Sequence, residues 1–218
     1  MPRPRVHDPD RVLDVAEELV ASGGPERCTV RALAAASGMS NGAIYHAFGS
    51  VPALLARVWL RAAGDFLDLQ AALADAARDP GDAVVAVADA PAVFAGRRPH
   101  AARMLMTVPR DRLLGPAVPG EPAEAMLALD RRLLDLLTRL ARALWGRADA
   151  AAVEVVTLCV VDLPTAVFRR ALTEPAVDGR PVITDDARRR LAVAVRAVLE
   201  LPPPPRRAPS GRGSSGKD

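Results

Sequence analysis

Aromatic residues are scarce in this 218-residue chain: they make up 3% of it, although half of the residues are hydrophobic. A core must therefore be built mainly from Ala, Leu and Val. These residues recur at helical spacing, and alternating β-branched runs are limited to short segments, which argues against an extensive β-sheet. The composition predicts an all-α protein, and its length allows one compact core or a small domain followed by a larger one.

Cysteine is also rare, since the chain contains only Cys28 and Cys159, far apart in the sequence. Charged residues interrupt the first predicted helix, so we recognise no secretory signal. We therefore expect a reduced, cytoplasmic compartment in which both thiols are structural. The most apolar run, residues 155–168, is shorter than a bilayer requires and contains Asp162 and Pro164, which argues against a membrane protein.

No catalytic or metal-binding pattern stands out. The three histidines, His7, His46 and His100, have no Cys, Asp or Glu at a metal-ligand spacing on the same helix. The sequence contains neither a Gly-rich phosphate loop nor a GxSxG nucleophile elbow. We therefore expect no enzyme activity, no cofactor and no metal.

The most informative stretch is TVRALAAASGMSNGAIYHAF, at residues 29–48. Its first threonine is a good helix N-cap, and the Ser-Gly pair at 37–38 ends the first helix because glycine tolerates left-handed backbone. A second short helix follows, with Ile44 and Phe48 four residues apart on its inner side. The pattern predicts a helix-turn-helix, which lays its second helix in a DNA major groove; a helical hairpin that touches no nucleic acid is the alternative.

The flanking segments also predict helices. Asp8 and Pro9 suit the cap and first turn of a helix that ends at Gly23-Gly24, and Ser50-Val51-Pro52 opens a longer one. Over about residues 8–65 this order resembles the DNA-binding domain of the tetracycline-repressor (TetR/AcrR) family of bacterial transcription regulators. The motifs that carry the resemblance are Ala-Glu-x-Leu, Thr-Val-x-x-Leu-Ala, Ser-Gly-Met-Ser-x-Gly-x-Ile-Tyr, Phe-Gly-Ser and Leu-Leu.

The resemblance implies three segments: a helix-turn-helix DNA-binding domain at 6–65, a larger helical effector-binding and dimerisation domain at 66–203, and a tail at 204–218. The tail has no apolar face to bury, and its composition predicts disorder. Arg3 and Arg5, at the other terminus, form either an arm that reaches DNA or part of a disordered end.

The expected DNA-binding surface comprises the starts of the two short helices. The first 50 residues carry five Arg against six acidic residues, so affinity must rely on locally placed Arg and on helix N-termini. In the family the tyrosine of the Ile-Tyr pair commonly meets phosphate, whereas a half-buried packing role is the alternative for Tyr45. The full expected set is Thr29, Arg31, Ser40, Asn41, Gly42, Ala43, Tyr45 and His46.

Two positions depart from the family pattern. Family members commonly carry a histidine just before the phenylalanine and a lysine just after the serine that follows, and both tend to contact phosphate. Here those positions are Ala47 and Val51. We expect His46 to take over part of the first contact, whereas Val51 has no donor with which to replace the second.

Beyond residue 65, Pro and Gly separate further helices, which we expect at 79–95, 98–107, 122–145, 150–172 and 185–201, with a loop at 108–120. In resembling proteins the last two helices form a four-helix bundle with those of a second subunit. The helix at 150–172 is apolar almost all round, more than one intramolecular face needs. We therefore expect a homodimer through 150–172 and 185–201 on a palindromic DNA operator; the alternative is that both helices are simply core.

An effector pocket is expected between four helices: the long one that begins at Ser50, the one near 100–107, and those at 122–145 and 150–172. Pro164 should interrupt helical hydrogen bonding near Val160 and leave a bulge that faces the cavity. Asp162 is either a polar anchor for the ligand or the partner of an arginine such as Arg103. The expected ligand-binding residues are Phe66, Phe94, Arg103, Met104, Met126, Thr157 and Asp162.

These features together predict a DNA-binding transcriptional regulator, and more specifically a repressor that a small, mainly apolar effector releases from its operator. A DNA-binding regulator without a small-molecule effector, controlled by a partner protein or by its own abundance, is the alternative.

Overall fold

The computed structural model describes residues 8–114, 121–174, 182–203 and 205–206. Every regular element in these ranges is helical, which confirms the predicted all-α class. Arg3, Arg5 and all of the predicted tail except residues 205–206 lie outside the described residues, as does part of the predicted loop at 108–120.

The helices begin and end close to the positions that their capping residues predict. In the N-terminal part a short 3₁₀ turn, Pro25–Arg27, separates the first two helices. The elements are α1 (Pro9–Gly23), α2 (Val30–Ser37), α3 (Asn41–Phe48), α4 (Val51–Asp75), α5 (Pro80–Ala88), α6 (Ala90–Arg97), α7 (Pro99–Thr107), α8 (Arg110–Leu114), α9 (Glu121–Trp145), α10 (Ala150–Thr157), the π-helical segment η2 (Leu158–Asp162), α11 (Leu163–Thr173) and α12 (Asp185–Glu200).

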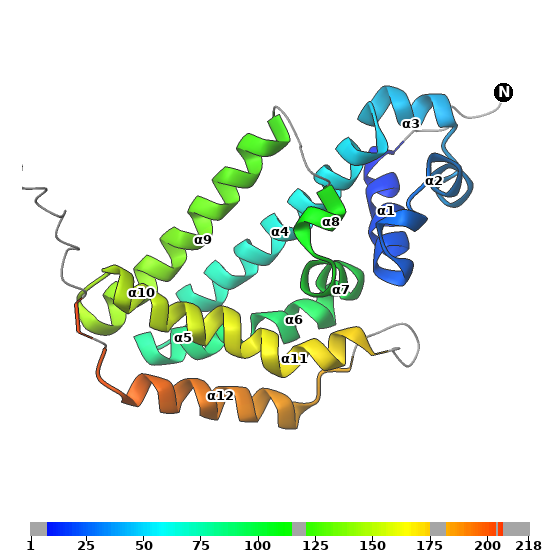
Figure 1. Cartoon of the computed structure of the whole chain (residues 1–218). Coiled ribbons are helices and arrows are strands. Elements are labelled where there is room, and N and C mark those ends of the chain that lie inside the picture. The colour runs from blue at the N-terminus through cyan, green and yellow to red at the C-terminus, as the bar shows by residue number, and fades with distance from the viewer. Residues whose placement is uncertain (1–7, 115–120, 175–181, 204, 207–218) are drawn as a thin grey trace, which may run out of the picture.

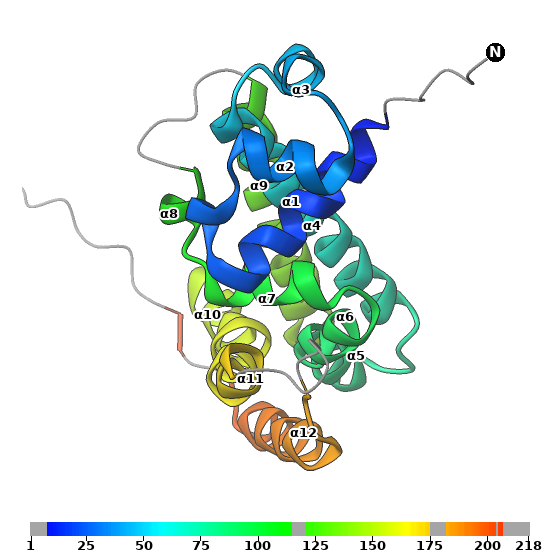
Figure 2. The same ribbon diagram turned by 90° about the vertical axis from the view of Figure 1, so that its right-hand side faces the viewer.

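Helices α1, α2 and α3 form a small unit at one end of the molecule (Figure 1). The start of α4 completes its core, in which Val12, Leu33, Ile44, Phe48 and Leu54 are buried together. In both views α3 lies at the edge of the molecule opposite α12 (Figures 1 and 2). The outward side of α3 is therefore far from the last helix.

The larger part of the chain surrounds α4, which runs alongside α9 and packs against α5, α6 and α7 (Figure 1). Helices α10 and α11 form one nearly continuous rod through η2, and α12 packs on α5 and α11. Helix α4 therefore packs against both the α1–α3 unit and the larger part of the chain.

Two helix predictions beyond residue 65 were wrong. The single helix expected at 79–95 is two helices that meet at Asp89. Pro91 has no N–H and its ring would clash with the carbonyl of Val87, so the chain starts a new helix there. The predicted loop at 108–120 contains the short helix α8, whose Leu113 is buried in the core.

The rod from Ala150 to Thr173 is longer than the apolar run at 155–168 from which the sequence argument started. It has 24 residues, and the mean hydropathy of its most apolar 18-residue window is 1.9, so length and composition alone would let it cross a membrane; the bent pair of α3 and α4 meets the same criterion. The core helix of a soluble protein has the same properties, and 39% of this rod's most apolar window is buried inside the subunit.

Candidate DNA-binding surface and ligand cavity

Side-chain caps and a tight turn hold α2 and α3 in their relative positions. The Thr29 hydroxyl accepts a hydrogen bond from the N–H of Ala32 at 3.2 Å, and the Ser40 hydroxyl accepts one from Ala43 at 3.2 Å. Between the helices Gly38 has φ +74°, a left-handed conformation that glycine adopts without strain. The turn is closed by Met39, which is buried, so the start of α3 is rigidly placed.

The outer side of α3 carries the side chains that the sequence assigned to it. Ile44 and Phe48 are buried, as predicted, whereas Asn41 and His46 are exposed. Tyr45 is 54% exposed, so its ring is free to reach a ligand rather than being confined to a packing role. Of the expected DNA-binding residues, Thr29, Arg31, Ser40, Asn41, Gly42, Tyr45 and His46 are exposed and Ala43 is half-buried.

One positively charged residue near α3 was not among the predicted DNA-binding residues. Arg57 lies on α4, and its guanidinium donates to the carbonyl of Ala47 at 3.3 Å and stands 5.7 Å from the centre of the Phe48 ring. Its side chain is exposed at the end of α3. Arg57 thus places a cation beside Ala47, where the family pattern has histidine; no feature of the sequence distinguished it from Arg61, the other arginine on α4.

The larger part of the chain contains an apolar cavity of about 240 Å³, lined by the four helices that the sequence predicted as its walls, α4, α7, α9 and the α10–α11 rod, and also by Pro91 of α6 and Arg110 of α8. Phe66 lines it, as expected. Phe94 is buried behind Phe66, with the two ring centres 5.3 Å apart. The lining residues are Trp59, Ala63, Phe66, Leu67, Gln70, Pro91, Leu105, Met106, Arg110, Leu129, Asp130, Leu133, Val160, Val161 and Thr165.

Several expected ligand-binding residues do not line this cavity. Met104 and Met126 are buried in the core beside it. Thr157 donates its hydroxyl to the carbonyl of Val153 at 2.9 Å, a bond within its own helix. Arg103 is half-buried, and its carbonyl accepts the hydroxyl of Thr107.

The placement expected for Asp162 was wrong in both of its forms. Its side chain is exposed, and it forms no ion pair with Arg103 or with any other described residue. The predicted bulge is present as η2, but one inserted residue turns a helix by about 100°. Val160 and Val161 consequently face the cavity while Asp162 points away from it.

The cavity has polar groups at positions that the sequence did not single out. The guanidinium of Arg110 stands 4.7 Å from the centre of the Trp59 ring and donates to Asp130 at 3.1 Å. Gln70, farther along α4, is only 2% exposed, and its amide oxygen has no hydrogen-bond donor among the described residues. A lone glutamine in a helix of Ala and Leu carries no sequence signal, because only tertiary packing shows that it is buried.

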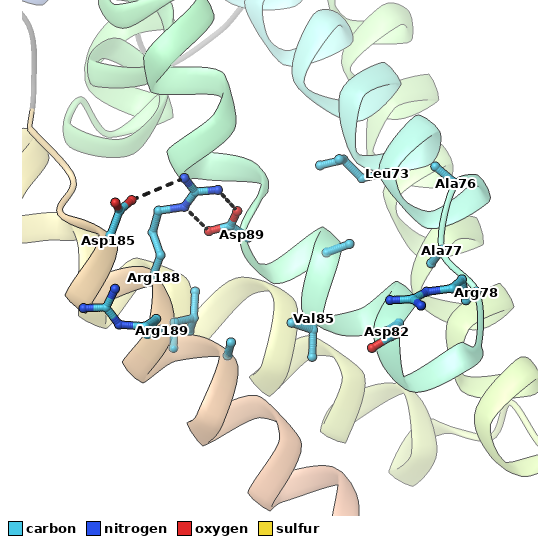
Figure 3. Close-up of a pocket in the computed structure, with 13 residues that line it drawn as sticks. Leu73, Ala76, Ala77, Arg78, Asp82, Val85, Asp89, Asp185, Arg188 and Arg189 are labelled. Atoms are coloured by element: carbon cyan, nitrogen blue, oxygen red, sulfur yellow. Dashed lines mark hydrogen bonds and ion pairs between the residues drawn. The ribbon is translucent and has the colours of Figure 1, made fainter.

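A second hollow, of about 650 Å³, lies between the α4–α5 corner and the start of α12 (Figure 3). Its charges are largely paired with each other: Arg188 donates to both oxygens of Asp89 at 2.9 and 2.5 Å and lies 3.9 Å from Asp185. The hydrogen bond from Arg196 lowers the pKa of Asp82 at the other end. These pairs attach α12 to α5 and α6, and the hollow is more open and more charged than the first one.

A cluster of charges joins the α1–α3 unit to the larger part. Glu17 of α1 is buried and accepts from Arg98, which precedes α7, at 2.7 Å and from Arg61 of α4 at 3.3 Å. Arg61 also pairs with Asp14 at 2.7 Å, and Arg98 also pairs with Asp65. Three helices are thereby linked through one carboxylate.

Both cysteines are buried and unpaired, in agreement with a structural role. Burial raises the pKa of each thiol to about 11, which suppresses the reactive thiolate. Among the described residues no group of three or more His, Cys, Asp or Glu is arranged to hold a metal ion.

Comparisons with known proteins agree with this arrangement. Residues 12–58, which span most of α1 to the first part of α4, match the sequence model of bacterial regulatory proteins of the tetR family. No curated protein matches the chain in sequence.

Three similar solved structures illustrate the fold. FadR from Bacillus subtilis, in complex with stearoyl-CoA, is 14% identical with a TM-score of 0.59, over 88% of this chain and 96% of that one. PfmR from Thermus thermophilus is 19% identical with a TM-score of 0.60, over 88% and 98%. The ketosteroid regulator KstR2 of Mycobacterium tuberculosis is 15% identical with a TM-score of 0.62, over 90% and 95%. At these identities the similarity shows a shared fold.

Proposed function

The chain belongs to the tetR family of bacterial regulatory proteins, and we propose that it is a cytoplasmic repressor of transcription that a small, mainly apolar effector releases from DNA. The observation that carries the proposal is the α2–α3 unit. Its helix starts are capped and its second helix is anchored by Ile44 and Phe48, so the opposite face of that helix is held outward at one end of the molecule.

DNA recognition follows from which groups this unit presents. The N–H groups at the start of a helix favour phosphate, and Arg31 stands at the start of α2. Asn41 and Tyr45 lie on the exposed face of α3, where side chains meet base edges in helix-turn-helix proteins. Arg57 adds a cation at the end of α3. We assign the preference for a DNA sequence to Asn41, and affinity for the DNA phosphate backbone to Arg31 and Arg57.

A dimer would place two such units on a palindromic operator. In the single subunit, α10–α12 leave large apolar side chains exposed, including Leu158 at 39% and Val193 at 68%. A second copy of the same surface would cover them, since a two-fold interface brings one patch against itself. Half-sites about one helical turn apart, roughly 34–36 Å or a multiple, are then required.

The cavity supports an effector, and α4 supplies the coupling. Its first turn follows α3 directly, while its middle carries Trp59, Ala63 and Phe66 on the cavity wall. A ligand that favours one position of α4 over another would change the separation of the two α3 helices in a dimer. The ligand named for one similar structure, stearoyl-CoA, carries a long apolar acyl chain, and the lining of this cavity is likewise mainly apolar.

The test begins with selection of DNA sequences that the purified protein binds, followed by measurement of affinity against salt concentration. Arg31→Ala should weaken binding to all sequences and reduce the slope of log K against log salt by about 1. Asn41→Ala should instead relax sequence preference at one base pair, by about 1–3 kcal/mol. Arg131→Ala on α9 is the matched control and should change neither quantity.

Failure to select any sequence, with the protein folded, would contradict the function. Identical behaviour of Arg31→Ala and Asn41→Ala would contradict the assignment of roles.

A further inference from the structure

Gln70 differs from the other buried polar residues that the structure describes. Glu17 is paired with two arginines, and the hydroxyl of Ser37 accepts from the N–H of Met39 at 3.2 Å. Gln70 is 2% exposed, yet its amide oxygen is fully buried without a donor among the described residues. An unpaired buried acceptor is unfavourable because it has lost its hydrogen bonds to water.

Packing alone does not explain a glutamine at this position. The apolar residues Leu67, Leu69 and Leu73 lie beside it on α4, and a side chain such as Met would fill the same volume without a polar atom. Gln70 also lines the apolar cavity. The amide therefore lies in the cavity wall, and since its oxygen and nitrogen exchange places by a half-turn of the terminal group, it can present its oxygen to a molecule in the cavity.

The cavity has two distinct ends along α4. Trp59 and Gln70 are eleven residues apart on one helix, which corresponds to about 16 Å at 1.5 Å per residue. At the Trp59 end, Arg110 covers the indole ring and is neutralised by Asp130. These two are the only charged residues on the described lining, so the Gln70 end offers an uncharged amide among apolar side chains.

We propose that Gln70 is the polar anchor of this cavity, and that the effector is a compact, uncharged, mainly apolar molecule with one hydroxyl or amide N–H that donates to the Gln70 amide oxygen. The inference rests on the proposed function and names the chemical class of its effector. The cavity volume of about 240 Å³ equals the space of roughly eight water molecules at about 30 Å³ each. That is room for a molecule of the size of an alkylphenol and not for the whole of stearoyl-CoA.

Two probes that differ in one group test this. 4-Propylphenol carries a hydroxyl donor where 4-propyltoluene carries a methyl group, and the two have nearly the same size. Binding of both to the full chain is measured by calorimetry, for the wild type and for Gln70→Met. The phenol-to-toluene affinity ratio should fall about tenfold in the variant, since removal of a hydrogen bond to a neutral buried group has an effect of this order.

Ala63→Met is the matched control, because Ala63 lines the same cavity without a polar side chain. It should weaken both probes to the same extent and leave their ratio unchanged. An equal ratio in wild type and Gln70→Met overturns the anchor, and so does the absence of binding of either probe to the wild type. Selection of bound DNA sequences distinguishes failure of the Gln70 proposal from failure of the proposed function. If the protein binds an operator but Gln70→Met leaves the phenol-to-toluene affinity ratio unchanged, the protein remains a regulator whose effector is not recognised by Gln70.

Discussion

Replacement of Glu17 by Gln should loosen the α1–α3 unit from the rest of the protein. The substitution keeps the size of the side chain and removes its charge. The side chains of Arg61 and Arg98 are 23% and 28% exposed. After the substitution each keeps one carboxylate partner, Asp14 for Arg61 and Asp65 for Arg98. The change therefore tests whether the central carboxylate of the cluster holds the two parts together.

The magnitude follows from the partial burial of these groups. Loss of one partner from a fully buried ion pair costs about 3–5 kcal/mol, and exposed pairs contribute about 0–1 kcal/mol. Since both guanidiniums are about a quarter exposed and retain a second partner, we expect a loss of about 1–3 kcal/mol in the free energy of unfolding. For a chain of this length a loss of about 2 kcal/mol corresponds to a fall in Tm of roughly 4–8 °C.

Asp14→Asn is the matched control, because Asp14 contacts the same Arg61 but is 68% exposed. Its expected cost is about 0.5 kcal/mol or less. Denaturant unfolding and thermal melts, at equal protein concentration, measure both variants, and operator affinity is measured alongside. If Glu17→Gln and Asp14→Asn are equally stable within about 0.5 kcal/mol, the cluster does not hold the α1–α3 unit to the larger part of the chain and the reasoning from burial fails.

Two further predictions concern the surface of α12 and the start of α10. Val193→Glu should shift the protein toward monomers in sedimentation at micromolar concentration, since a charge would then face the partner subunit. Leu134→Glu, on the exposed side of α9, is the control and should leave the dimer intact. If Val193→Glu leaves the stability of the dimer unchanged, the face of α12 that carries Val193 is not the dimer interface. The hydrogen bonds from Arg147 hold the pKa of Asp149 at about 2, below the ordinary value of about 3.9. The stability that ionised Asp149 contributes through its pairing with Arg147 is therefore fully present above about pH 4 and is lost as the pH falls through about 2. The difference in stability between wild type and Asp149→Asn should be constant from about pH 5 to 8 and vanish near pH 2, and a difference that persists there would contradict the pairing.

The amino-acid sequence by itself determined the local structure. The caps at Thr29, Ser40 and Ser50 set the starts of α2, α3 and α4, and the left-handed Gly38 ends α2, through bonds between residues at most four apart. The π-helical segment before Pro164 follows in the same way from a missing N–H. Interactions of this range depend on neighbours in the chain, so the reading of residues 29–48 needed no tertiary information.

Tertiary packing alone decided the groups that would govern a ligand response. Glu17 and Arg98 are 81 residues apart in sequence. Arg110 of α8 contacts Trp59 of α4 and Asp130 of α9, which are three separate helices. Gln70 is a buried unpaired amide because α4 lies against several other elements. Such contacts depend on where distant helices meet, and helical periodicity does not contain that information, since it identifies an apolar face but not the element that covers it.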